Sequence, residues 1–318
     1  MRILLQFPEG LKQEALAHAK KYEKQGHEVF LSASPCYGAC DVAIDEAKAV
    51  GAKKIIHFGH ARFVKKKLPI AVEYVEYKLD FDLNSFTNVI PQLKQYKKIA
   101  IGTTVQYVHK IDSVKKLLRT NGFIPLTGKG TAAIYESQIL GCDATAVTRF
   151  EKQADAREPG EGADKKSQFL ADAILFIGDG KFHPLAITSD KPVFVFHPKS
   201  GKLERINDEI NAYRKKRKGA LLKALDAKTF GIIISTKIGQ MNVKLAEWAK
   251  KELIKRGKNA EILVGNEIEP TSLNNFMAFD CFITTACPRL AEDREEFVKP
   301  VLDLFLFKEY LKLIDTLR

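Results

Sequence analysis

Residues 98–126 read KIAIGTTVQYVHKIDSVKKLLRTNGFIPL and contain a complete strand–helix–strand pattern. The apolar run Lys98–Thr103 predicts a buried strand, and Ile111–Thr120 carries apolar residues at helical spacing. Gly122 stands just past this helix, where the left-handed cap conformation favours glycine. A second apolar run, Gly122–Leu126, follows at once. This order predicts two parallel strands of one sheet joined by a right-handed helical crossover.

The same pattern occurs once before and once after this stretch. Helical spacing recurs over Gln13–Gln25 and Val243–Arg256, and Gly26 and Gly257 stand just past these two segments. A pattern found three times is an internal repeat, which is stronger evidence than any single strand assignment. The twelve predicted strands are Arg2–Phe7, His27–Ser32, Lys54–Phe58, Ile70–Tyr74, Lys98–Thr103, Gly122–Leu126, Ala173–Ile177, Pro192–Phe196, Phe230–Ser235, Ala260–Val264, Cys281–Thr285 and Pro300–Phe305.

We therefore predict an α/β protein of three related domains, each a small and mainly parallel β-sheet flanked by helices. Lys-rich, weakly apolar stretches near Gln95 and Gly219 place the domains at residues 1–95, 96–219 and 220–318. The polar segment Ala154–Lys166 (ADAREPGEGADKK) is expected to be an exposed loop within the second domain.

Three of the five cysteines fall in loops of this repeat, one in each copy. Cys40 lies in PCYGACD (35–41), Cys142 in ILGCDAT (139–145) and Cys287 in TTACPRLAED (284–293). Small residues flank each one, and Asp or Pro follows it directly, which is typical of a strand-to-helix loop. Thiols so far apart in sequence exclude a local zinc knuckle. If they meet at a central junction, three soft ligands and one open position can hold an iron–sulfur cluster that still binds a substrate.

The other two cysteines are predicted not to be ligands. Cys281 lies beside Phe282 in a predicted strand, where a cysteine is usually a small buried hydrophobe. Cys36 stands four residues before Cys40, but the common radical-enzyme motif C-x-x-x-C-x-x-C would need a third cysteine where the chain has Ala43. Any cluster must therefore be assembled from distant parts of the chain.

Composition indicates a globular protein with an excess of basic residues. The chain has 318 residues, 45% hydrophobic and 28% charged, and a formal net charge of +12. The basic runs Lys65–Lys67 and Arg214–Lys218 suit nucleic acid or an acidic protein, or they form a solvated helix face. Direct nucleic-acid binding is not expected, because no recognition motif is present. The apolar runs are too short to span a membrane, and the N-terminus reads as a strand, so we predict a cytoplasmic protein.

Several motifs together resemble the archaeal diphthamide-biosynthesis radical enzyme family over essentially the whole chain. They are YGACD (37–41), HFGH (57–60), TTVQYVHK (103–110), LGCDAT (140–145), GDGKFHPL (178–185), STKIGQMN (235–242) and TACPRLAED (285–293). The resemblance implies three α/β domains that each give one cysteine to a central 4Fe–4S cluster. The implied ligands are Cys40, Cys142 and Cys287, the same three that the repeat indicates.

The resemblance further implies a transferase. S-adenosylmethionine would bind the open iron, and its 3-amino-3-carboxypropyl group would pass to a histidine of elongation factor 2. The implied partners are elongation factor 2, an electron donor and a second copy in a homodimer. The apolar C-terminal run Val298–Leu317 would belong to that dimer interface or form a last buried strand and helix.

Strand-end residues are the candidates for the S-adenosylmethionine pocket, because ligands of α/β sheets collect beyond the carboxyl ends of the strands. Arg289 is the foremost candidate, since a guanidinium can clamp a carboxylate in a bidentate manner. The candidates are Thr103, Thr104, Gln106, Asp179, Phe182, His183, Gln240 and Arg289.

Two other functions compete with this interpretation. The three cysteines could hold a structural metal in a non-catalytic, triplicated small-molecule-binding protein. The basic runs could instead serve a ribosome- or RNA-binding protein, which would bind RNA in a salt-sensitive manner without any cluster.

Overall fold

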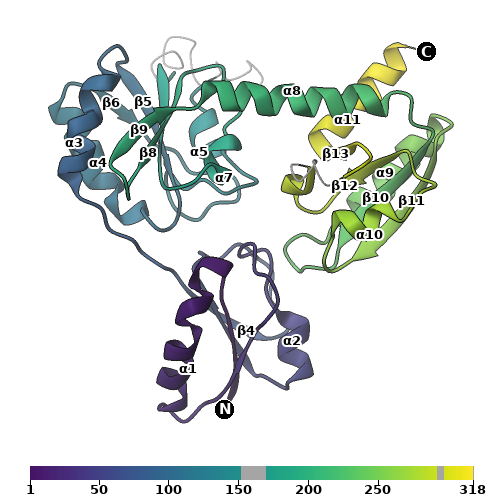
Figure 1. Cartoon of the computed structure of the whole chain (residues 1–318), viewed down its shortest axis with the longest axis horizontal. Coiled ribbons are helices and arrows are strands. Elements are labelled where there is room, and N and C mark those ends of the chain that lie inside the picture. Colours follow the sequence, from purple (N-terminus) through teal and green to yellow (C-terminus); the bar gives the residue numbers. More distant parts are fainter. Residues whose placement is uncertain (152–169, 292–296, 318) are drawn as a thin grey trace, which may run out of the picture. The chain divides into compact units, whose positions relative to one another are not determined.

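The computed structural model describes residues 1–151, 170–291 and 297–317 of the chain. These residues form three β-sheets with the strand orders β2-β1-β3-β4, β6-β5-β7-β8-β9 and β11-β10-β12-β13 (Figure 1). Each sheet thus places the first strand of its copy between the second and the third. All pairings are parallel except that of β8 with β9. The predicted α/β class and the triplicated sheet are confirmed.

The strands are β1 (Arg2–Gln6), β2 (Glu28–Leu31), β3 (Lys54–Phe58), β4 (Ala71–Val75), β5 (Lys98–Thr103), β6 (Ile124–Leu126), β7 (Ala173–Ile177), β8 (Val193–His197), β9 (Lys202–Arg205), β10 (Thr229–Ser235), β11 (Asn259–Gly265), β12 (Cys281–Thr284) and β13 (Val301–Asp303). The helices are α1 (Ala15–Glu23), α2 (Ile44–Ala49), α3 (Leu83–Val89), α4 (Ile111–Thr120), α5 (Thr145–Thr148), α7 (Phe182–Leu185), α8 (Asn207–Ala224), α9 (Val243–Lys255), α10 (Pro270–Asn274) and α11 (Leu304–Thr316), with 3-10 turns η1 (Glu9–Glu14), η2 (Ile90–Leu93), η3 (Val108–Lys110) and η5 (Pro288–Ala291).

The helix ends follow the glycine signal in the sequence. Gly26, Gly122 and Gly257 have φ angles of 82°, 84° and 72°, the left-handed region predicted for them. Two details differ from the prediction. The edge strand β9 was not predicted, and the strand predicted at Pro300–Phe305 is limited to β13, because the carboxylate of Asp303 accepts the backbone N–H of Leu306 at 3.0 Å and caps α11. The predicted loop Ala154–Lys166 lies outside the described residues.

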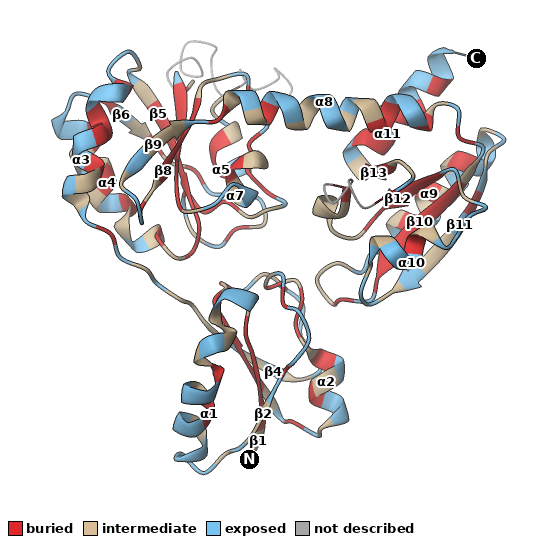
Figure 2. Cartoon of the chain, viewed as in Figure 1, coloured by how far each residue is buried: buried red, intermediate tan, exposed pale blue. Residues whose placement is uncertain are grey.

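Alternating strand residues build a core on both faces of the middle sheet. Ile99 and Ile101 of β5 pack with α3 and α4, whereas Ala100 packs with the residues of α5 on the other face. Figure 2 shows the same division, with buried residues on the strands and on the inner sides of the helices. The period-two alternation therefore sandwiches the sheet between helices.

The C-terminal run predicted as an interface or as a buried strand and helix forms β13 and α11. Phe307 and Tyr310 of α11 are fully buried against the third sheet, and Trp248 of α9 packs edge-on to Phe307 at a centroid distance of 5.7 Å. Most of this apolar run is thus used within its own domain.

By its internal contacts the chain divides into two compact units. Residues 1–35 and 45–211 form unit 1, which holds the first two sheets, and residues 36–44 and 212–318 form unit 2, which holds the third sheet. The segment that carries Cys40 therefore packs with the third sheet. The three domain boundaries at 1–95, 96–219 and 220–318 stay a prediction.

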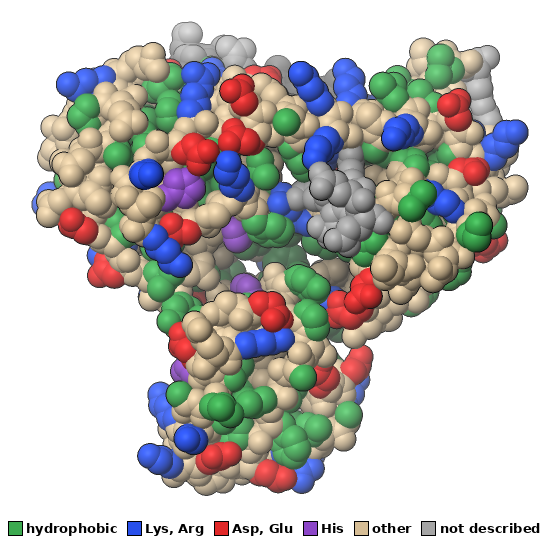
Figure 3. All heavy atoms as spheres, viewed as in Figure 1, with side chains coloured by type: hydrophobic (Ala, Val, Ile, Leu, Met, Phe, Trp, Pro, Cys, Tyr) green, Lys and Arg blue, Asp and Glu red, His purple; other side chains and the backbone are tan. Residues whose placement is uncertain are grey.

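Charges of both signs share the surface. On the face drawn in Figure 3, Lys and Arg side chains are interspersed with Asp and Glu and do not gather into one patch. Among the described residues, no helix has the length and apolarity that crossing a bilayer requires.

Candidate functional site

The Cys40 loop of unit 2 is held by the loop between β10 and α9. The Gly239 N–H donates to the Cys40 carbonyl at 2.9 Å, and the Gln240 Nε2 lies 3.3 Å from the Cys40 Sγ. A Cβ added at Gly239 would lie 2.5 Å from the Cys40 Cα, so only glycine fits this approach. Burial raises the pKa of the Cys40 thiol, and the Gln240 hydrogen bond works in the opposite direction.

An ion-pair cluster fixes the same two loops. The Lys237 Nζ lies 2.6 Å from the Asp41 Oδ2 and 2.8 Å from the Glu267 Oε1, and 4.7 Å from the ring centroid of Tyr37. Lys237 and Asp41 are each 7% exposed. Because a buried charge needs a partner, this cluster ties the residue after Cys40 firmly to the end of β10.

Cys287 lies at the same edge of the third sheet as Gln240. It follows β12, which pairs with β10. Thr285 joins the end of β12 to β10, because its backbone N–H and its hydroxyl donate to the Ile233 carbonyl at 3.0 and 2.9 Å. The next residues form η5, which carries Arg289. The Nε and Nη1 atoms of Arg289 are shielded from solvent.

The Cys142 loop of unit 1 is held by contacts close in sequence. Leu140 and Asp143 exchange backbone hydrogen bonds at 2.9 and 3.1 Å across Cys142. The Asp143 carboxylate accepts the backbone N–H groups of Ala132 at 2.7 Å and of Thr145 at 2.9 Å. Cys142 itself is exposed.

Phe182 lies against this loop. A Cβ at Gly141 would come within 2.3 Å of the Phe182 ring, so the ring contacts the backbone directly beside Cys142. Phe182 begins α7, which follows β7, and its ring meets that of His183 edge-on at 5.1 Å. The predicted residues Phe182 and His183 are therefore brought to the Cys142 loop.

Three further candidates connect the ends of the unit 1 strands. Thr103 is fully buried and its hydroxyl donates to the Ile177 carbonyl at 2.7 Å, which joins the ends of β5 and β7. The Gln106 amide donates to the Gly59 carbonyl at 2.9 Å. The Asp179 carboxylate accepts the Tyr107 hydroxyl at 2.9 Å.

Thr104 completes the set. It is buried, and its carbonyl accepts the Tyr107 N–H at 3.1 Å. Unit 1 therefore gathers Cys142 with six of the pocket candidates at the carboxyl edge of its second sheet. Unit 2 gathers Cys40, Cys287, Gln240 and Arg289 at the corresponding edge. All five cysteines of the chain are thiols, and thiols on strand-end loops are the donors that an iron–sulfur cluster requires.

The sequence did not single out a histidine pair at the end of β3, in which His57 is buried and His60 is half-buried. The His57 Nδ1 lies 2.9 Å from the Gln6 Oε1, and the His57 Nε2 lies 2.9 Å from the His60 Nδ1. Burial lowers the pKa of His57 to about 3 and that of His60 to about 4. Both rings are thus neutral at physiological pH. The HFGH motif was the available signal, but nothing in it reveals the contact with Gln6.

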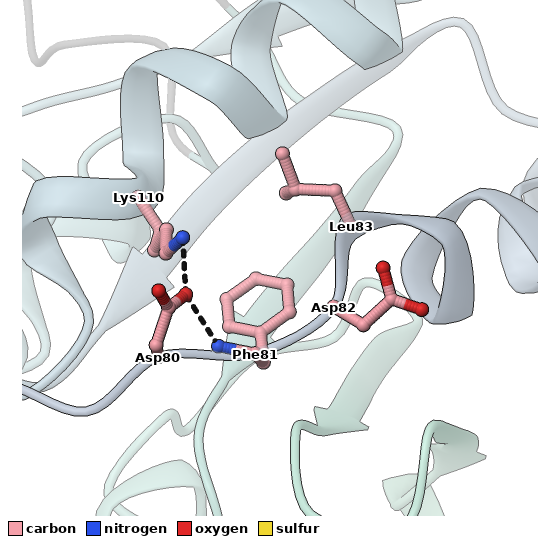
Figure 4. A pocket seen from close by; sticks show the side chains of 5 residues that line it. All are labelled: Asp80, Phe81, Asp82, Leu83 and Lys110. Atoms are coloured by element: carbon pink, nitrogen blue, oxygen red, sulfur yellow. Dashed lines mark hydrogen bonds and ion pairs between the residues drawn. The ribbon is translucent and has the colours of Figure 1, made fainter.

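An open depression on unit 1 is a separate feature. Its lining residues are Asp80, Phe81, Asp82, Leu83 and Lys110 (Figure 4). Lys110 forms an ion pair with Asp80, and the Asp80 carboxylate also accepts the Phe81 N–H at 2.7 Å. None of the predicted site residues lines it, and the third charged residue, Asp82, caps α3 by accepting the Asn84 N–H at 2.9 Å.

Known proteins resemble the chain over nearly its whole length. Residues 7–314 match a family model described as "Putative diphthamide synthesis protein". The chain belongs to this diphthamide synthesis family. It is 34% identical over 307 residues to the 2-(3-amino-3-carboxypropyl)histidine synthase of Pyrococcus horikoshii, a match that covers 95% of this chain and 83% of that protein. The synthase of the same name from Methanocaldococcus jannaschii is 31% identical over 331 residues, covering 98% and 84%.

A solved structure of the diphthamide synthesis family has the same fold. The crystal structure of Dph2 from Pyrococcus horikoshii with a 4Fe–4S cluster superimposes with a TM-score of 0.82 and 33% identity, covering 98% of this chain and 86% of that one. Two of the segments that carry the resemblance lie at the strand-end sites. STKIGQMN holds Cys40, and GDGKFHPL carries Asp179 and the Phe182 that packs beside Cys142.

Proposed function

We propose that this protein is a 2-(3-amino-3-carboxypropyl)histidine synthase. It transfers the 3-amino-3-carboxypropyl group of S-adenosylmethionine to a histidine of elongation factor 2, the first step of diphthamide biosynthesis. The observation that carries this proposal is the 34% identity over 307 residues to a protein of that name. The strand-end thiols and the 4Fe–4S cluster of the Pyrococcus horikoshii structure support it.

Cys40, Cys142 and Cys287 are the proposed cluster ligands, whereas Cys36 and Cys281 are not. The three ligands lie on loops that follow strands, and Cys281 is fully buried inside β12. Cys36 is buried as well, which is typical of a cysteine that packs as a small hydrophobe. A 4Fe–4S cluster held by three thiolates supplies one electron and one open iron position for the amino and carboxylate groups of the cosubstrate.

The protein residues orient the cosubstrate in this proposal. Arg289 pairs with the carboxylate of S-adenosylmethionine, because its planar fork matches that group and it lies two residues from a ligand. Phe182 and His183 contribute ring surfaces beside Cys142. The strand-end residues Thr103, Thr104, Gln106, Asp179 and Gln240 complete the proposed set.

The proposed setting is the cytoplasm, with an electron donor and a homodimeric assembly. A net charge of +12 favours encounter with an acidic protein such as elongation factor 2. Direct binding to nucleic acid is not part of the proposal.

A labelling experiment tests the reaction. The reduced protein is incubated without oxygen with carboxyl-labelled S-adenosylmethionine and elongation factor 2 from the same cell. Label should enter the factor, methylthioadenosine should form, and replacement of the target histidine should abolish labelling. Formation of 5′-deoxyadenosine would mean that a different carbon–sulfur bond is broken.

Single cysteine-to-alanine variants test the ligand set. Iron retained after anaerobic reconstitution should fall in the variants of Cys40, Cys142 and Cys287 and stay at the wild-type level in those of Cys36 and Cys281. Equal retention in all five variants would contradict the assignment. A colourless protein that holds zinc in place of iron would favour the structural-metal alternative.

A further inference from the structure

The loop between β10 and α9 (residues 236–242) holds the backbone of Cys40 without any cluster. It forms its own turn, because the backbone N–H groups of Gln240 and Met241 both donate to the Lys237 carbonyl, at 2.8 and 3.0 Å. From this turn, the Gly239 backbone N–H donates a hydrogen bond to the Cys40 carbonyl at 2.9 Å. The backbone of Cys40 is thus fixed before a metal arrives.

The buried ion pair adds a second restraint to the same loop. Lys237 holds Asp41, the residue directly after Cys40, at 2.6 Å in a site where both residues are 7% exposed. Removal of Lys237 would leave Asp41 buried without its cation, which is strongly unfavourable, whereas Lys237 also has Glu267 as a partner. Rotation of the Cys40 loop away from β10 is therefore costly.

The third contact reaches the sulfur. The Gln240 amide group is placed 3.3 Å from the Cys40 Sγ with its Nε2 toward the sulfur. A sulfur that bonds iron as a thiolate is an acceptor, so an amide N–H suits it and an amide oxygen does not. Hydrogen-bond donors to the cluster sulfurs stabilise the reduced cluster, because it carries more negative charge than the oxidised one. They therefore raise the reduction potential of the cluster.

We propose that residues 236–242 form a preorganised support for Cys40 and that Gln240 is a positioning residue whose amide N–H bonds the ligand sulfur and tunes the cluster potential. This inference rests on the proposed function in assigning Cys40 as a ligand. It gives Gln240 a role at the cluster in addition to its proposed place in the S-adenosylmethionine pocket.

The first test uses the protein without its cluster. Gly239→Ala places a methyl group against the Cys40 backbone, whereas Gly219→Ala is the matched control, because no atom lies within 4 Å of a Cβ there. Alkylation of each cysteine by iodoacetamide is followed by peptide mass spectrometry, and Trp248 fluorescence checks that unit 2 remains folded. The Cys40 rate should rise about tenfold in Gly239→Ala, as expected for about 1.4 kcal/mol of lost local stability.

The rates at Cys142 and Cys287 should stay unchanged, as should the Cys40 rate in Gly219→Ala. An unchanged Cys40 rate in a folded Gly239→Ala variant would overturn the support. This readout needs no cluster and no activity, so it stands even if the proposed reaction fails.

The second test uses Gln240→Met, which keeps the length of the side chain and removes the donor. A redox titration followed by electron paramagnetic resonance should show a more negative midpoint potential than in the wild type. A potential equal to that of the wild type, whether or not S-adenosylmethionine binding weakens, would refute the role assigned to Gln240. In Gln240→Asn the shorter amide cannot reach the sulfur, so this variant should show the same more negative potential as Gln240→Met. A wild-type potential in Gln240→Asn would therefore also count against a specific N–H···S bond.

Discussion

The loops of Cys40 and Cys142 carry the same Cys-Asp pair after the second strand of their sheets, yet they are held in different ways. Asp41 binds Lys237, which lies 196 residues away in the sequence. Asp143 binds the backbone of Ala132 and Thr145, within 11 residues. The comparison teaches that one sequence signature can depend on long-range packing in one copy and on local hydrogen bonds in another.

The solvent exposure of the two thiols and the side chains that contact their loops differ as well. Cys40 is half-buried, and the Gln240 amide contacts its sulfur, whereas Cys142 is exposed and its loop is covered from one side by the Phe182 ring. Perturbation of the Cys40 loop should therefore affect the stability of unit 2, whereas perturbation of the Cys142 loop should remain local. Three predictions test this difference, and a fourth compares the two units at acidic pH.

The largest effect is expected for Lys237→Met. Two carboxylates would lose their cation, and breaking a buried ion pair costs roughly 3–5 kcal/mol of unfolding free energy. The chain has one tryptophan, Trp248, and it lies in unit 2, so urea unfolding followed by its fluorescence reports on this unit. The control is Lys250→Met, whose ion pair with Glu261 is exposed and should cost less than about 1 kcal/mol. Equal losses in the two variants would contradict the prediction.

The second-largest effect is expected at acidic pH, where unit 1 should lose more stability than unit 2, because all seven histidines lie in unit 1. His57 and His60 have folded-state pKa values of about 3 and about 4, below the value of about 6.5 expected when unfolded. Below that pH the unfolded state binds more protons, so the stability of unit 1 falls as the pH falls toward 4. Between pH 7 and pH 5 we expect a loss of about 2 kcal/mol for each histidine.

Urea unfolding at the two pH values is the measurement. The change should be seen by far-ultraviolet circular dichroism and be much smaller by Trp248 fluorescence. His60→Asn removes one titrating group and should reduce the pH dependence. A pH dependence that is the same for both probes would argue against the His57–His60 pair as its source.

A smaller effect is expected for Gly141→Ala. The added methyl group meets the edge of the Phe182 ring, and this ring is 50% exposed and can turn outward. The cost should therefore be near the lower end of overpacking penalties, about 1–2 kcal/mol. Phe182→Ala in the same chain should relieve it, which a double-mutant cycle in urea would show. An additive cycle would mean that the ring and the loop do not contact each other.

The smallest effect is expected for Thr145→Val. The Thr145 hydroxyl contacts the Asp143 carboxylate and accepts the Thr131 N–H at 2.9 Å. Valine keeps the shape and removes these bonds, so about 1 kcal/mol should be lost. Iron retention should stay close to that of the wild type, because the two backbone donors to Asp143 remain. A loss of iron as large as that in Cys142→Ala would show that the local hydrogen bonds are critical.

Most of the sheet architecture could be predicted from the sequence, because buried parallel strands are continuous apolar runs and the cap glycines mark the helix ends. The edge strand β9 (KLER) lacks an apolar run, so nothing in its composition indicated a strand. The start of α11 was missed although Asp303 before an apolar run is an N-cap signal.

The candidate site likewise has one part that could be predicted from the sequence and one part that could not. Cys142 and Phe182 lie at strand ends that the repeat locates, so their grouping follows from the topology. The pairing of Asp41 with Lys237, and of Cys40 with Gln240, joins residues 196 and 200 positions apart. No local pattern encodes such a contact, and only the packed third sheet reveals it.

That separation also sets an order of events during protein synthesis. The ribosome completes residues 36–44 long before Lys237 and Gln240 exist. At about 5–20 residues per second, the interval is roughly 10–40 s. During this time the Cys40 thiol has none of its supporting contacts and is open to oxidation or to capture by a stray metal ion. A cell that makes this protein therefore has a reason to load iron and sulfide only after translation has passed β10.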